Sequence, residues 1–197
     1  MSTNGNIDMK SYLVTCVIIF FSSVTITTAQ IQDIPDGFIV TPLMRSTHFV
    51  RDMDESLKLY KDILGLRPRF EQTFKSEEWD KILGVGGKTI RVVHLQSGDS
   101  VIANVGLFEF VGDEHPPAPA SRTFVKTGDA ALVFETSDIF TINDKVKAAG
   151  YSIVSEPIVL FPQQGAKTQA YESLFFDRDG ILVNLTQYNV PSTDGAK

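Results

Sequence analysis

Val50-Arg-Asp-Met-Asp-Glu-Ser-Leu-Lys-Leu-Tyr-Lys-Asp-Ile-Leu-Gly65 is the stretch of sequence that decides the fold. Asp52, followed three residues later by Glu55, has the pattern of a capping box, which starts a helix by satisfying its first free N–H groups. Apolar residues then recur at helical spacing, and Gly65 supplies the left-handed residue on which many helices end. The stretch therefore predicts an amphipathic helix from 53 to 64.

The pattern around this helix occurs twice in the chain. A β-type run at 45–52 precedes the first helix, and a similar run at 131–138 precedes a second helical stretch that ends at Gly150. Strand-like runs follow each helix, at 66–74, 88–95 and 101–111 and then at 152–159, 170–176 and 181–188. An additional short helix is expected at 77–83. The sequence predicts an α+β fold in which a strand, a helix and three strands are repeated once.

Breaks in composition divide the chain around these two modules. Three prolines fall within four positions, from Pro116 to Pro119, and such a run cannot sustain a helix or a central strand. We therefore expect a Pro-rich linker between the modules and a short polar tail at the end. The expected segments are a lead-in at 30–41, a first module at 42–111, the linker at 112–126, a second module at 127–190 and the tail at 191–197.

The first 29 residues have the pattern of a secretory signal peptide. Lys10 precedes an apolar run at 12–21, and the small residues around Ala29 suit a signal peptidase, so Gln30 would begin the mature chain. The sequence thus predicts a secreted or periplasmic protein without stable membrane insertion. The alternative is an uncleaved N-terminal membrane anchor, and translation starting at Met9 instead of Met1 also stays open.

Composition excludes several classes of function. The net charge is −6 and the pI is about 5.0, so the chain lacks the basic face that a nucleic-acid partner requires. Cys16 is the only cysteine and lies within the predicted signal. The mature chain would therefore have no disulfide and no thiolate nucleophile. No catalytic residues can be assigned from spacing.

Two motifs identify a family resemblance. The stretch from Val50 to Gly65 resembles the opening signature of the vicinal-oxygen-chelate superfamily, and Phe176-Asp-Arg-Asp-Gly-Ile-Leu-Val183 resembles its closing one. This is the superfamily of glyoxalase I, bleomycin-resistance proteins and extradiol dioxygenases. The resemblance implies two βαβββ modules, each with a curved sheet around a cavity. The modules of such proteins pair within one chain or across a homodimer.

The resemblance also implies where a metal would bind, and this sequence departs from it there. Enzymes of the family hold a divalent cation with His or Gln and Glu side chains from four strands. The corresponding residues here are Arg45, Gly106, Ala131 and Asn184. Only the asparagine could coordinate a cation, and weakly, while the arginine would repel one. The sequence therefore predicts no metal cofactor at the family's position.

Nearby residues offer few replacements for the missing ligands. His48 lies three positions from Arg45, and Glu109 three from Gly106, so each is expected on the opposite face of its strand. His94 and Glu172 cannot be assigned to a face from the sequence. A relocated site for Zn²⁺, Ni²⁺, Mn²⁺ or Fe²⁺ therefore stays open as an alternative.

The residues at the altered positions would still line the cavity and could bind a small molecule. Arg45 offers a planar donor fork for a carboxylate or phosphate, unless it pairs with a buried carboxylate of the protein itself. The expected ligand-binding residues are Arg45, Thr47, Phe49, Gly106, Phe108, Ala131 and Asn184. Such a wall suits a partly apolar ligand with an anionic end. Two functions result: a metal-free binding protein similar to the bleomycin-resistance branch, or a metal-dependent lyase, isomerase or dioxygenase.

Overall fold

The computed structural model describes residues 36, 37, 39–161 and 167–191. The predicted signal peptide at 1–29 lies outside these residues, as do most of the lead-in and of the polar tail. Within them, no helix combines the length and the apolar character needed to cross a membrane.

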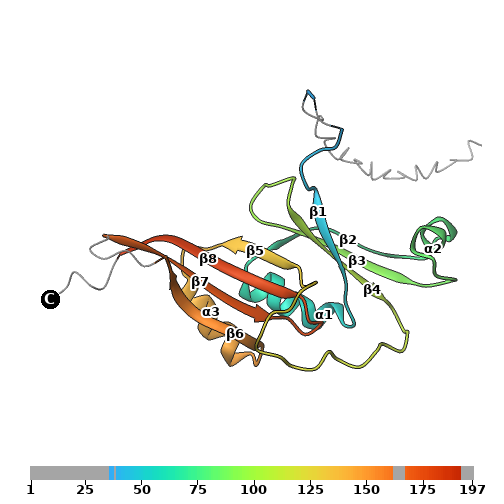
Figure 1. The fold of residues 1–197 in the computed structure, drawn as a ribbon. Helices are drawn as coiled ribbons and strands as arrows, with labels where there is room; N and C mark the ends of the chain where they lie inside the picture. The colour runs from blue at the N-terminus through green and yellow to red at the C-terminus, as the bar shows by residue number, and fades with distance from the viewer. Residues whose placement is uncertain (1–35, 38, 162–166, 192–197) are drawn as a thin grey trace, which may run out of the picture. The chain divides into compact units, whose positions relative to one another are not determined.

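The first module forms a four-stranded sheet. Its spatial order is β1-β4-β3-β2, with β1 and β4 parallel and the other neighbours antiparallel (Figure 1). The strands are β1 (Arg45–Phe49), β2 (Arg67–Phe74), β3 (Ile90–Gln96) and β4 (Asn104–Phe110).

The second module repeats this arrangement in the order β5-β8-β7-β6, again with one parallel pair, β5 and β8. Its strands are β5 (Ala131–Glu135), β6 (Ser152–Leu160), β7 (Thr168–Phe176) and β8 (Leu182–Pro191). The predicted α+β fold of two βαβββ modules is confirmed.

The helix predicted at 53–64 begins at the predicted residue but changes its hydrogen-bonding pattern halfway along. Asp52 caps α1 (Met53–Leu57), its carboxylate accepting hydrogen bonds from the N–H groups of Asp54 and Glu55. The chain then widens into the π-helix η1 (Lys58–Ile63), in which Leu64 N donates to Leu59 O at 2.9 Å. The helix expected at 53–64 is therefore present, with an α-helical first half and a π-helical second half that the sequence pattern did not distinguish. In the second module, Asp138 caps α3 (Ile139–Ala148).

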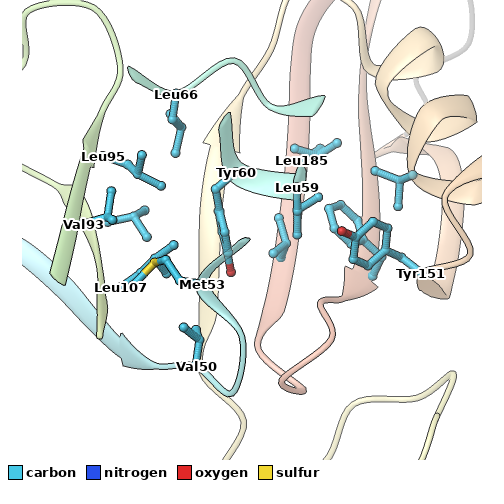
Figure 2. Packing of buried hydrophobic residues seen from close by; sticks show 14 of the residues in the cluster. Val50, Met53, Leu59, Tyr60, Leu66, Val93, Leu95, Leu107, Tyr151 and Leu185 are labelled. Carbon is cyan, nitrogen blue, oxygen red and sulfur yellow. The ribbon is translucent and has the colours of Figure 1, made fainter. Parts of the chain in front are cut away.

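One hydrophobic cluster joins the two modules. It contains Val93 and Leu107 from the first sheet, Tyr60 from η1, Val146 from α3 and Leu185 from the second sheet, all almost completely buried. Figure 2 shows η1 residues between the apolar side chains of the two sheets. Each sheet therefore buries its helix-covered face in this shared core. The opposite faces of the two sheets look away from the core, and we call them the first and second open faces.

The linker between the modules contains no helix or strand, as its prolines predict, but it is anchored to the second module. The Arg122 guanidinium lies 4.0 Å from the centre of the Phe176 ring on the second open face. Both Asp129 oxygens accept hydrogen bonds from the same guanidinium, at 2.5 and 2.6 Å. The Ser121 and Ser152 hydroxyls are 2.7 Å apart. The linker therefore covers one end of the second open face.

Candidate functional site

Strand register brings most of the predicted ligand-binding residues onto the first open face. Thr47 pairs with Gly106 across β1 and β4, and Gly106 pairs with His94 across β4 and β3. Phe49 pairs in the same way with Phe108. Because alternate residues of a strand share a face, Arg45 lies on this side as well.

The side chain of Arg45 extends from β1 across the neighbouring strand β4, over Gly106. Its Nε donates to Thr47 Oγ1 at 3.0 Å, and its Nη1 is 3.4 Å from His94 Nδ1. A Cβ atom at Gly106 would stand only 2.7 Å from Arg45 Cδ and 3.1 Å from Thr47 Oγ1. The missing side chain of Gly106 therefore creates the space that Arg45 occupies.

The charge of Arg45 has no partner in the described part of the chain. The ion pairs found there join other residues, including Arg51 with Asp179 and Arg91 with Asp54 and Glu71. The interpretation in which Arg45 neutralises a buried carboxylate of the protein is thus not supported among these residues. Its remaining N–H groups are available to an external anion.

Aromatic side chains form the rest of the first open face. The Phe49 ring lies 5.6 Å from Phe108 and 5.7 Å from Phe110, and Trp79 of α2 (Glu77–Leu83) lies 5.8 Å from Phe108. Phe108, Phe110 and Trp79 belong to a second, smaller apolar cluster around Val92. Phe49 remains 50% exposed, so the wall is open to a ligand from outside.

His94, which the sequence could not place, lies on this face beside Arg45. Its ring stands 5.3 Å from that of Phe70 and 6.4 Å from that of Phe108. Burial lowers the pKa of His94 to about 4, with further contributions from the positive charges of Arg45 and Arg69. The imidazole is therefore neutral at physiological pH.

His48 and Glu109 lie on the helix-covered side of the sheet, as their odd offsets predicted. His48 pairs with Leu107 of the shared core, and its Nε2 is 2.9 Å from Ser46 Oγ. Glu109 pairs with Arg91, and burial raises the pKa of its carboxyl group. Neither residue takes part in the site around Arg45.

The remaining two predicted residues, Ala131 and Asn184, lie on the second open face. Asn184 is only 8% exposed and pairs in register with Val133 and Leu174. Glu172, the other residue that the sequence could not assign, lies one pair further along the same face. Because the two open faces look away from the common core, one chain does not bring Asn184 and Arg45 into one cavity. The seven predicted ligand-binding residues thus divide between the two open faces, five on the first and two on the second, and their role in binding stays a prediction.

The four positions that correspond to metal ligands in the resembling enzymes do not fit a divalent cation. They present a guanidinium, no side chain, a methyl group and a nearly buried amide. Across the described residues, no three His, Cys, Asp or Glu side chains gather in a way that could hold a metal ion. The first open face presents an arginine without a carboxylate partner among the described residues, beside an aromatic wall.

The comparison with solved structures finds a glyoxalase family protein of the same fold. The solved structure of a glyoxalase family protein from Bacillus cereus superposes with a TM-score of 0.61 at 16% sequence identity, covering 79% of this chain and 99% of that one. A glyoxalase/bleomycin resistance protein/dioxygenase domain from a Frankia species gives a TM-score of 0.49 at 17% identity, covering 76% and 99%. A search of curated proteins finds no match.

A family model also matches residues 44–185, which cover most of both modules and the whole linker between them. The chain therefore belongs to the Glyoxalase/Bleomycin resistance protein/Dioxygenase superfamily.

Proposed function

We propose that this protein is exported and binds a small, partly apolar, anionic molecule on the first open face, without the metal of its enzymatic relatives. The observation that carries the proposal is the position of Arg45. Its guanidinium lies over Gly106 without a carboxylate partner among the described residues, next to an aromatic wall. A charge-assisted hydrogen bond at the edge of an apolar surface is stronger than the same bond in water.

Trp79 makes this proposal directly testable. It is the only tryptophan of the chain and packs against Phe108 on the first open face, so its fluorescence should report a ligand bound there. Phenylacetate is a suitable probe because it combines a ring with one carboxylate. We expect it to change Trp79 emission saturably, and we expect the neutral phenylacetamide to bind much more weakly.

Arg45→Ala should weaken phenylacetate binding by roughly 10- to 100-fold, because one hydrogen-bonded charge contributes about 1.5–3 kcal/mol. Arg91→Ala is the matched control, since Arg91 lies on the same sheet but pairs with Asp54 and Glu71 on the helix-covered side. Equal affinities of the Arg45→Ala variant and the wild type would remove Arg45 from the site.

Metal analysis of the purified protein tests the other half of the proposal. We expect no stoichiometric Ni, Zn, Mn or Fe after extensive dialysis. A retained equivalent of any of these metals would contradict the metal-free proposal. It would favour a lyase, isomerase or dioxygenase with a relocated metal site.

Export is supported by the signal-like pattern of residues 1–29. N-terminal sequencing of the protein recovered from the periplasm or medium should begin at Gln30. Recovery only in the membrane fraction, with the apolar segment intact, would instead favour the uncleaved anchor.

We also propose that two copies associate through their open faces. Each chain leaves apolar side chains exposed on both faces, with Phe49 at 50% and Val133 at 63%. Exposed apolar side chains on a curved sheet favour a partner that covers them. A homodimer would enclose the Arg45 site, which one chain leaves open.

A further inference from the structure

The shared core opens to solvent at one end, beside the edge strand β5. A cavity of about 300 Å³ lies there, a size at the lower end of the range of small-molecule sites. Its floor consists of Leu66, Leu95 and Val105, which are at most 6% exposed and belong to the cluster that joins the modules (Figure 2). Protein cores leave few voids larger than a water molecule, so a core-lined cavity of this size has room for a ligand.

One wall of the cavity is the loop at 97–103, which joins β3 to β4 and is held in place by backbone contacts. Ala103 N donates to Leu43 O at 2.9 Å, and Asn104 N donates to Met44 O at 3.1 Å. Ala103 has a φ of 53°, a left-handed conformation that an alanine keeps only where its surroundings fix it. Residues in such conformations are concentrated at ligand sites. The cavity is therefore preformed, and binding would not require the loop to become ordered.

Glu135 is the only charged residue that lines the cavity, and it forms no ion pair within the described part of the chain. Backbone acceptors lie beside it, because β5 is an edge strand. Thr136 N donates to Thr186 O of β8 at 2.9 Å, and alternate residues of a strand direct their backbone groups to opposite sides. The carbonyl groups of Val133 and Glu135 therefore point to the free edge, where the cavity lies.

We propose that this cavity binds a small primary amine, with the ammonium group at Glu135 and the apolar body against Leu66, Leu95 and Val105. An ammonium group has three N–H donors, so it can bond to the carboxylate and to a strand carbonyl at the same time. An anionic molecule would meet the carboxylate without a counter-charge. A divalent cation such as Ca²⁺ needs about six to eight oxygen ligands, and the cavity offers one carboxylate. The three floor residues lie on the core side of the first sheet, so the site is separate from the first open face and independent of Arg45.

Two probes of the same shape test the charge of the ligand. 2-Phenylethylamine carries an ammonium group at pH 7, whereas 2-phenylethanol has the same apolar body and a neutral hydroxyl. We expect isothermal titration calorimetry to show that the amine binds roughly 3- to 10-fold more tightly than the alcohol. In ¹H–¹³C spectra the amine should shift the methyl signals of Ile102, which lines the cavity and whose signals Ile102→Ala identifies. Phenylacetate should leave these signals in place.

Substitutions separate the contributions of the carboxylate and the apolar wall. Glu135→Gln should weaken binding of the amine roughly 3- to 10-fold and leave binding of the alcohol unchanged. Glu172→Gln is the matched control, because it removes a carboxylate from the same sheet outside the cavity. Ile102→Ala should weaken both probes by a similar factor, and Ile158→Ala, at an exposed position of β6, should weaken neither. Far-UV circular dichroism verifies that each variant is folded.

Several results would overturn this proposal. Unshifted Ile102 methyl signals at millimolar 2-phenylethylamine would show that the cavity takes no amine. Equal affinities of the wild type for the amine and the alcohol would remove the role of Glu135, and this comparison holds even if Glu135→Gln fails to fold. Equal losses in Glu135→Gln and Glu172→Gln would mean that only the overall charge of the protein matters. Displacement of the amine by phenylacetate would place both probes in one site and contradict a separate cavity.

Discussion

At the scale of single residues, Gly106 and Arg45 act as one unit. Arg45 can lie across β4 only because no Cβ projects from Gly106, as the 2.7 Å approach to Arg45 Cδ shows. The resembling enzymes have a glutamate at the position of Gly106. Here the glycine removes that metal ligand and leaves space for the positively charged side chain of Arg45. The two departures from the family pattern explain each other.

Gly106→Ala should displace Arg45 and weaken phenylacetate binding by about 10-fold, with little change in stability, because the atom that clashes belongs to a flexible side chain. Trp79 fluorescence and thermal unfolding measure the two effects. Gly86→Ala is the control, since a Cβ there would meet nothing within 4 Å. In an Arg45→Ala background, Gly106→Ala should have no further effect on binding. An additive loss would show that the two residues act separately.

Strand alternation explains which site residues could be predicted. Arg45, Thr47 and Phe49 are the exposed residues of β1 and alternate with less exposed ones, so their common face follows from the period of two along the strand. In β3 both Val92 and Val93 are buried, because one faces the aromatic wall and the other the shared core. The period of two is lost there, and only the pairing with Gly106 assigns His94 to a face.

At the scale of elements, capping signals in the sequence predicted correctly where helices begin and end. Structure that depends on contacts between distant parts of the chain could not be predicted in this way. The short helix predicted at 77–83 is observed as Glu77–Leu83, capped by Ser76 and ended by the left-handed Gly84. The π-helix was missed because its cause lies far away in the sequence. It buries Leu59 and Tyr60 side by side, and the Tyr60 hydroxyl reaches Asp177 of the other module.

The anchored linker gives a prediction at this scale. Arg122→Ala removes both the cation over Phe176 and the partner of Asp129, so the linker should detach more readily from the second module. Proteinase K should then cleave within residues 112–126 several-fold faster than in wild type, as resolved by mass spectrometry. Lys126→Ala, in the same segment but without an ion pair in the described residues, should cleave at the wild-type rate. Equal rates for both variants would mean that the prolines alone hold the linker.

At the scale of the whole molecule, buried polar contacts tie the modules together. Tyr60 Oη donates to Asp177 Oδ2 at 2.9 Å, and Arg51 pairs with Asp179 at 2.7 Å. The repeat of modules could be predicted from their similar signatures. The sheet faces that meet in the shared core could not be predicted from the sequence, because central strands such as β8 are buried on both sides.

Asp177 makes this junction sensitive to pH. Burial, assisted by the nearby Asp179, raises the pKa of Asp177 from 3.8 to about 6, although hydrogen bonds from Ile181, Tyr60 and Asp179 oppose the rise. The folded protein thus holds this proton more tightly than the unfolded chain. The resulting stabilisation is fully present below about pH 4 and is lost as the pH rises through about 6, with a magnitude on the order of 3 kcal/mol.

Asp177→Asn should remove this dependence, so that wild type loses more stability than the variant between pH 4.5 and 7. Urea unfolding at each pH measures the difference. Asp144→Asn, on the exposed side of α3, should leave the wild-type slope unchanged. Parallel pH profiles for wild type and Asp177→Asn would show that Asp177 titrates normally in the folded state.

Association through the open faces is the remaining property of the whole molecule, and Val133 tests it. Val133 is 63% exposed on the edge strand β5, where a charge costs the single chain little but would be buried in a dimer. We expect sedimentation equilibrium to give the mass of a dimer for wild type and a shift towards monomer for Val133→Asp. Thr141→Asp adds the same charge at an exposed position of α3, on the far side of the sheet from Val133, and should remain dimeric. Because a second copy would cover the Arg45 site, Val133→Asp should also weaken phenylacetate binding at the same protein concentration. A wild-type monomer at tens of micromolar protein, or equal masses for the two variants, would contradict association through these faces.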